Sequence, residues 1–131
     1  MPMHENEKEM ENWIIELNLD AVVCSGSRRN VSIWEEWMGP TETMFRAAAK
    51  SGTPTLGICF GHQILSKLNG GKVKQSKDRE FGLANIKQIK DSLLTKNFFN
   101  NKKTNKVWMS HADQVSKLPK SFNIVASSQN S

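Results

Sequence analysis

The residues most able to do chemistry lie in the segment Leu56-Gly57-Ile58-Cys59-Phe60-Gly61-His62-Gln63. A cysteine stands between two glycines, in the pattern Gly-x-Cys-x-Gly, where an apolar run ends and a helical pattern begins. This arrangement is typical of a nucleophile elbow. The turn is so tight that side chains two residues before and after the nucleophile would collide with backbone, which explains Gly57 and Gly61. The pattern therefore predicts that Cys59 is a catalytic nucleophile rather than a buried structural cysteine.

The helix that follows Cys59 would supply the other groups that a nucleophilic thiol needs. Its first N–H groups and its positive dipole end point toward the sulfur and favour the thiolate. The N–H of Phe60, the residue after the nucleophile, is placed to donate to an oxyanion. Gln63 lies four residues beyond Cys59, so it faces the same side of the helix. In contrast, Cys24 ends a different apolar run and is expected to be a buried, inert thiol.

Short apolar strands and amphipathic helices alternate around this segment. Apolar residues at positions 10, 13, 14 and 17 indicate a first helix. A second helix opens at Gly39-Pro40-Thr41, with Thr41 as the N-cap, and Gly52 closes it. Buried strands are predicted at 20–24 and 54–59, a third helix at 61–68, and further strands at about 81–89, 107–110 and 124–127. This alternation favours an α/β fold with a parallel sheet covered on both faces.

The sequence resembles the class I glutamine amidotransferases, and among them the glutaminase domains of GMP synthases. Residues 57–63 are similar to the nucleophile motif of that family. Three further segments agree in order and spacing: Ser25-Gly26-Ser27, Arg79-Glu80-Phe81-Gly82 and Val107-Trp108-Met109-Ser110-His111-Ala112-Asp113. The resemblance implies a flavodoxin-like three-layer sandwich with a mostly parallel sheet. The whole chain, 1–131, is expected to form one amidotransferase domain, and an incomplete one.

The resemblance also implies a reaction and roles for six residues. Cys59 would attack the side-chain amide of glutamine, with the N–H groups of Gly26 and Phe60 holding the oxyanion. Gln63, Ser110 and His111 would bind the substrate, the last two largely through backbone around its α-amino and α-carboxylate groups. Ammonia would pass to a synthetase domain or subunit, which in GMP synthases aminates XMP with ATP and Mg²⁺ in purine biosynthesis. No cofactor is expected in this chain itself.

The catalytic partners of the cysteine are missing from the sequence. The family supplies a base and its orienting group from a histidine and a glutamate two residues apart, and no His-x-Glu follows Asp113. The family's opening strand, helix and second strand are not encoded either, so the chain resembles the middle of a domain. Among the histidines, we expect His4 to be exposed, His62 to be a packing or surface residue, and His111 to shape the pocket rather than act as base.

Composition excludes several other functions. The net charge of +5 comes from lysine-rich stretches without interleaved aromatic residues or a recognised motif, so we expect no nucleic-acid partner. We find no apolar run long enough for a membrane span, no metal-ligand spacing and no phosphate-binding loop. Two cysteines without a secretory signal favour reduced thiols in the cytoplasm. Two alternatives stay open: a stand-alone γ-glutamyl hydrolase or peptidase, and a non-catalytic remnant that only binds a partner.

Overall fold

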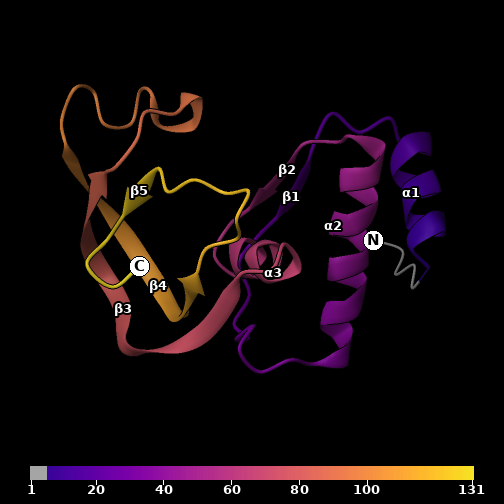
Figure 1. Ribbon diagram of the computed structural model, residues 1–131, viewed down its shortest axis with the longest axis horizontal. Coiled ribbons are helices and arrows are strands. Elements are labelled where there is room, and N and C mark those ends of the chain that lie inside the picture. Colours follow the sequence, from indigo (N-terminus) through magenta and orange to yellow (C-terminus); the bar gives the residue numbers. More distant parts are fainter. Residues whose placement is uncertain (1–5) are drawn as a thin grey trace.

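The structure, a computed structural model, describes residues 6–131 and has a mixed α/β architecture. Figure 1 shows the helices α1 and α2 on one side, the β-hairpin of β3 and β4 on the other, and β1, β2 and α3 between them. In chain order the elements are α1 (Glu7–Glu16), β1 (Val22–Cys24), the 3₁₀ helix η1 (Glu36–Met38), α2 (Gly39–Ser51), β2 (Thr55–Gly57), α3 (Phe60–Leu68), β3 (Lys72–Gln88), the 3₁₀ helix η2 (Leu93–Thr95), β4 (Thr104–Lys117) and β5 (Ala126–Ser127). The mixed α/β class expected from the sequence is confirmed.

The parallel part of the fold consists of β1 and β2. Val23 pairs with Leu56, and the ladder continues where the N–H of Ile58 donates to the carbonyl of Cys24 at 2.9 Å. Both strands therefore end at the same edge of the sheet. Cys59 follows β2 at this edge, and the loop containing Gly26 follows β1, so the two predicted parts of the thiol site start side by side.

The second sheet is antiparallel, whereas the sequence predicted a mostly parallel sheet, and its two long strands extend beyond their predicted ranges. β4 and β5 both pair with β3, in the order β4-β3-β5. The predicted strand 81–89 begins nine residues earlier, at Lys72, and the predicted strand 107–110 extends over Thr104–Lys117. The ends of both strands are polar and lysine-rich, and for this reason the sequence did not indicate their full length. A strand with a solvent-exposed face does not need apolar residues on that face. The ladder is irregular between Gln75 and Glu80.

The core lies between α1, α2, α3 and the loop that leads to η1. Met10 and Ile14 on α1 belong to the same buried cluster as Phe45 and Ala48 on α2, as the spacing of the first two predicted, whereas Leu17 at the end of that spacing is 48% exposed. Burial of each large apolar side chain in this core contributes about 1.5–3 kcal/mol to the stability of the fold. The buried apolar residues of this cluster are Met10, Ile14, Val22, Val31, Met38, Met44, Phe45, Ala47, Ala48, Phe60 and Ile64.

One local prediction is wrong. Thr41 is not the N-cap of α2, because the helix starts at Gly39 directly after η1 and Pro40 occupies its first turn. Gly52 does end the helix, with a left-handed φ of 72°. On β4, Trp108 is 78% exposed, and its register partner Leu83 on β3 is 67% exposed, so this part of the hairpin faces solvent.

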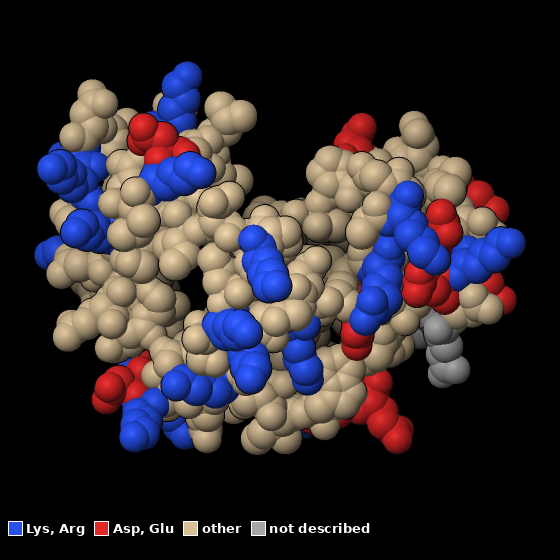
Figure 2. All heavy atoms as spheres, viewed as in Figure 1, with Lys and Arg blue, Asp and Glu red and all other residues tan. Residues whose placement is uncertain are grey.

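Basic side chains outnumber acidic ones on the surface. Figure 2 shows several Lys and Arg side chains gathered near α3 and the start of β3, with acidic side chains scattered around them. Among the helices of residues 6–131, none is long and apolar enough to cross a membrane.

Candidate functional site

The backbone at Cys59 has the strained conformation of a nucleophile elbow. Its φ of 53° and ψ of −106° lie in a region that residues with a side chain rarely adopt. The two glycines have no room for a side chain. A Cβ on Gly57 would lie 2.5 Å from the carbonyl carbon of Gly61, and a Cβ on Gly61 would overlap the carbonyl of Cys24. The predicted elbow is therefore present, with its glycines where backbone segments nearly touch.

Three predicted site residues lie around the Cys59 thiol. A Cβ added to Gly26 would stand only 3.6 Å from the Cβ of Cys59, so the glycine loop runs directly beside the nucleophile. The Sγ of Cys59 lies 3.8 Å from the carbonyl oxygen of Ser110 on β4. Phe60 is the first residue of α3, so its N–H has no partner within the helix. Its ring is buried and stacks on Trp37 with the centroids 5.5 Å apart, which holds the start of α3 in place.

Gln63 and His111 meet at the backbone of Asp113. The side-chain nitrogen of Gln63 donates to the Asp113 carbonyl at 3.1 Å, and Nδ1 of His111 contacts the same oxygen at 2.9 Å. Gln63 is only 6% exposed, so its amide lies inside the protein rather than at the surface. A role of either side chain in substrate binding stays a prediction.

The second ring nitrogen of His111 is also occupied. Its Nε2 lies 3.0 Å from Oε2 of Glu80, which accepts another hydrogen bond from Ser128 at 2.9 Å. Both partners of the ring, a carbonyl and a carboxylate, are acceptors. Both ring nitrogens of His111 therefore have partners within the protein. The Cys59 thiol, in turn, hydrogen-bonds to the Ser110 carbonyl and not to this ring.

Sequence reasoning missed the buried acidic residues of this network. Glu80 is 9% exposed and Asp113 2% exposed. The Asp113 carboxylate accepts from the Ser32 N–H at 2.7 Å and from the Ser32 hydroxyl at 2.9 Å. The only signal was that both acids stand in the segments 79–82 and 107–113 that carry the family resemblance. Nothing in the sequence marked Ser32.

Two ionisable groups near the elbow have shifted pKa values. Burial raises the pKa of the Cys24 thiol, but this residue is only partly buried, as Cys59 is, so the expectation of a buried cysteine is wrong. The pKa of His62, on the first turn of α3, is lowered mainly by burial and to a smaller extent by the charge of His111. His4 lies outside the described residues. Within 6–131, no group of three or more His, Cys, Asp or Glu side chains could hold a metal ion.

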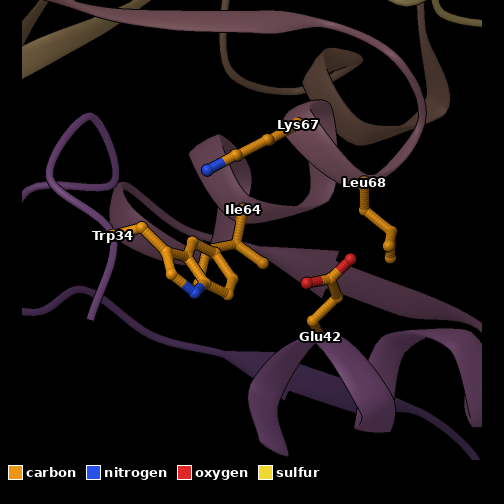
Figure 3. Close-up of a pocket in the computed structure, with 5 residues that line it drawn as sticks. All are labelled: Trp34, Glu42, Ile64, Lys67 and Leu68. Atoms are coloured by element: carbon orange, nitrogen blue, oxygen red, sulfur yellow. The ribbon is translucent and has the colours of Figure 1, made fainter. Parts of the chain in front are cut away.

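A pocket of about 240 Å³ lies on the other flank of α3 (Figure 3). Ile64, Lys67 and Leu68 line it from α3, together with Glu42 from α2 and Trp34 from the preceding loop. The Lys67 ammonium lies 4.3 Å from the centroid of the Trp34 ring. None of the six predicted site residues contributes to this lining, so the pocket is separate from the thiol.

Comparison with known proteins agrees with this geometry. The family Glutamine amidotransferase class-I matches residues 1–131. GMP synthase [glutamine-hydrolyzing] from Staphylococcus saprophyticus is 37% identical over 126 residues, which are 96% of this chain and 23% of that protein. The corresponding enzyme of Aquifex aeolicus is 44% identical over 80 residues, 61% of this chain and 15% of that protein. The matched part of the chain thus corresponds to less than a quarter of the length of either relative.

Solved structures show the same fold. A protein from Thermoplasma acidophilum, described as a GMP synthase subunit, has a TM-score of 0.74 at 26% identity, covering 95% of this chain and 58% of that one. A glutamine amidotransferase from Methylobacillus flagellatus has the same TM-score at 18% identity, covering 99% and 47%. The chain belongs to the class I glutamine amidotransferase family.

Proposed function

We propose that this chain is part of a GMP synthase-like glutaminase domain in which Cys59 attacks the side-chain amide of glutamine. The single observation that carries the proposal is the elbow itself. A cysteine with φ of 53°, at the N-terminus of α3 and beside the glycine loop, stores strain that packing alone does not require. Such strain is typical of a nucleophile exposed for reaction.

The reaction follows from the groups around the thiol. The thiolate of Cys59 attacks the amide carbon, and the carbonyl oxygen becomes an oxyanion that the N–H groups of Gly26 and Phe60 stabilise. The C–N bond then breaks, the nitrogen takes a proton and leaves as ammonia, and a thioester remains. Water adds to the thioester, so that glutamate and the thiol are released. Ser110 and His111, on the strand facing Cys59, would position the amino-acid end of the substrate.

Ammonia would be used by a synthetase partner. Support comes from the relatives, which are GMP synthases of about four times the length that this chain covers. ATP and Mg²⁺ would bind to that partner, because this chain offers neither a phosphate loop nor a metal cluster in its described part. Both cysteines are free, as a cytoplasmic location would keep them.

A second candidate, a binding subunit without catalysis, is favoured by one observation. The hydrogen bond of the Cys59 thiol goes to the Ser110 carbonyl, and both nitrogens of His111 are engaged elsewhere. In this arrangement Cys59 and His111 therefore each have other partners and are not hydrogen-bonded to one another.

One experiment separates the two candidates. Glutamate release is measured for the chain alone and for the chain extended by the family segments expected before and after it, including a His-x-Glu pair. The glutaminase proposal predicts turnover only in the extended protein, lost on Cys59→Ala. General acid–base help is worth about 10²–10⁴-fold, so the difference is large. Absence of turnover in a folded extended protein contradicts the proposal.

A further inference from the structure

Asp113 joins the segments that make up the thiol site. Its carboxylate accepts two hydrogen bonds from Ser32, at 2.7 and 2.9 Å, and its carbonyl oxygen contacts Gln63 and His111. Ser32 belongs to the loop that starts at Gly26, Gln63 belongs to the elbow helix α3, and His111 follows Ser110 on β4. One residue therefore fastens the glycine loop, the nucleophile helix and the predicted substrate strand to each other.

The glycine loop has few other anchors. Residues 25–35 lie in no helix or strand, and Arg29 pairs within the loop, 3.8 Å from Glu35. At the far end of the loop, the partly exposed Trp34 meets Lys67. Val31, which is fully buried, and Ser32, which reaches 81 positions along the chain, attach the middle of the loop to the rest of the protein. The apolar contacts of Val31 hold the loop in place but do not orient its backbone, because such contacts are not directional. The two hydrogen bonds of Ser32 fix both the position and the orientation of the backbone.

The burial of Asp113 makes this attachment strong. At 2% exposure its carboxylate has lost most of its hydration, and the two hydrogen bonds from Ser32 replace it. Hydrogen bonds to a charged group are about twice as strong as those between neutral groups. Releasing Ser32 would leave a buried charge without its partners, so the loop is held closely in one place.

We propose that Asp113 is a positioning residue which, through Ser32, keeps the N–H of Gly26 facing the Cys59 thiol. This inference rests on the proposed function in that Gly26 is the oxyanion donor. The hydrogen bonds of Asp113 go to Ser32, Gln63 and His111 and not to the thiol. Loss of the Ser32 contact should therefore affect only those reactions in which an oxyanion forms at Cys59.

Two electrophiles test this specificity. An L-amino-acid chloroketone of glutamine length presents a carbonyl that becomes an oxyanion when Sγ attacks, before the sulfur displaces chloride. Iodoacetamide alkylates the same thiol by direct displacement of iodide, without an oxyanion. The rate constants for modification of Cys59 by each reagent are measured by mass spectrometry for the full chain and its Ser32→Ala, Asp113→Ala and Asp113→Asn variants. Ser116→Ala is the matched control, since Ser116 lies on β4 near Asp113 but its hydroxyl is exposed and bonds to Lys72.

The expected result is a selective loss. In Ser32→Ala, chloroketone labelling falls about tenfold, less than the roughly 10²–10³-fold that follows removal of an oxyanion donor, while iodoacetamide labelling changes less than about twofold. Asp113→Asn recovers part of the rate compared with Asp113→Ala, because an amide can accept from the Ser32 N–H and donate to its hydroxyl. Where the unmodified chain prefers the L-chloroketone to the D-form, equal losses with both reagents, or no loss with either, overturn the inference.

Amide hydrogen exchange over residues 25–32 keeps the test independent of the proposed function. If the unmodified chain reacts equally with the L- and D-chloroketones, the proposed function has failed. The positioning inference then stands if Ser32→Ala and Asp113→Asn speed exchange in this loop but not in α1 and α2. Unchanged exchange in the loop overturns it in either case.

Discussion

Glu80 and His111 form a buried pair, with Oε2 of the carboxylate 3.0 Å from Nε2 of the imidazole and side-chain exposures of 9% and 12%. They come from opposite positions on β3 and β4, where Glu80 is the register partner of His111. The ladder is irregular on one side of this position, between Gln75 and Glu80, and regular on the other. The pair therefore fixes the register of the hairpin beside Ser110.

Glu80→Gln is expected to destabilise the protein by about 1–3 kcal/mol, because a hydrogen-bonded charge in a buried position is lost opposite His111. Chemical denaturation measures the change in the free energy of unfolding. Glu35→Gln is the matched control, since Glu35 pairs with Arg29 only at 3.8 Å on the surface, and should change stability by less than about 0.5 kcal/mol. Equal effects of the two substitutions would show that the buried pair adds no stability.

Gly57→Ala is expected to destabilise the fold by about 2–4 kcal/mol, because the new Cβ would lie within 2.6 Å of backbone atoms of Gly61 and His62. Gly39→Ala serves as the control, since nothing lies within 4 Å of a Cβ at that position in α2. There the effect should be neutral or stabilising by up to about 1 kcal/mol. Thermal unfolding of both variants checks the difference, and a Gly57→Ala protein as stable as the parent would contradict the elbow packing.

Cys59 is expected to react faster than Cys24 with a small alkylating reagent. Cys59 stands at the N-terminus of α3, whereas burial raises the pKa of the Cys24 thiol and keeps it protonated. Brief alkylation followed by peptide mass spectrometry should show Cys59 modified first. Preferential labelling of Cys24 would contradict the assignment of the nucleophile.

Stability should fall on mild acidification, in part through His62. The pKa of this residue in the folded protein is below its usual value of 6.5, so the unfolded chain binds the proton more readily. The contribution of neutral His62 to the free energy of unfolding is therefore complete above about pH 6.5 and is lost as the pH falls below that value. Unfolding measured from about pH 7.5 to 5.5 should show a smaller loss for His62→Asn than for the parent. Identical pH profiles would show that His62 does not contribute.

The β1–β2 sheet leaves an apolar face in contact with water. Val23, Leu56 and Ile58 are 58%, 40% and 50% exposed, although strands of this kind are normally covered on both faces. We expect the chain to bind a hydrophobic dye or to self-associate, and Val23→Thr with Leu56→Thr to reduce both. Leu93→Thr is the control, because Leu93 is exposed outside the sheets. A monomer that binds no dye would contradict this expectation.

The sequence predicted the local geometry of the site well and its supporting contacts poorly. The elbow could be recognised because its two glycines, its cysteine and the change from strand to helix all lie within seven consecutive residues. The Ser32–Asp113 contact joins positions 81 apart and involves a serine in an irregular loop, for which no periodic pattern exists. The long β3–β4 hairpin was underestimated for a related reason, since its exposed face tolerates Lys72 and Lys117 as readily as apolar residues.

Stereoselective modification of Cys59 tests the central claim most directly. The full chain is treated with the L- and D-forms of the glutamine-length chloroketone, with and without an excess of L-glutamine, and the site of modification is read by mass spectrometry. If Cys59 is a nucleophile directed at glutamine, the L-form labels it at least about tenfold faster, and L-glutamine slows this labelling. Equal labelling by both forms without protection by glutamine would contradict the account.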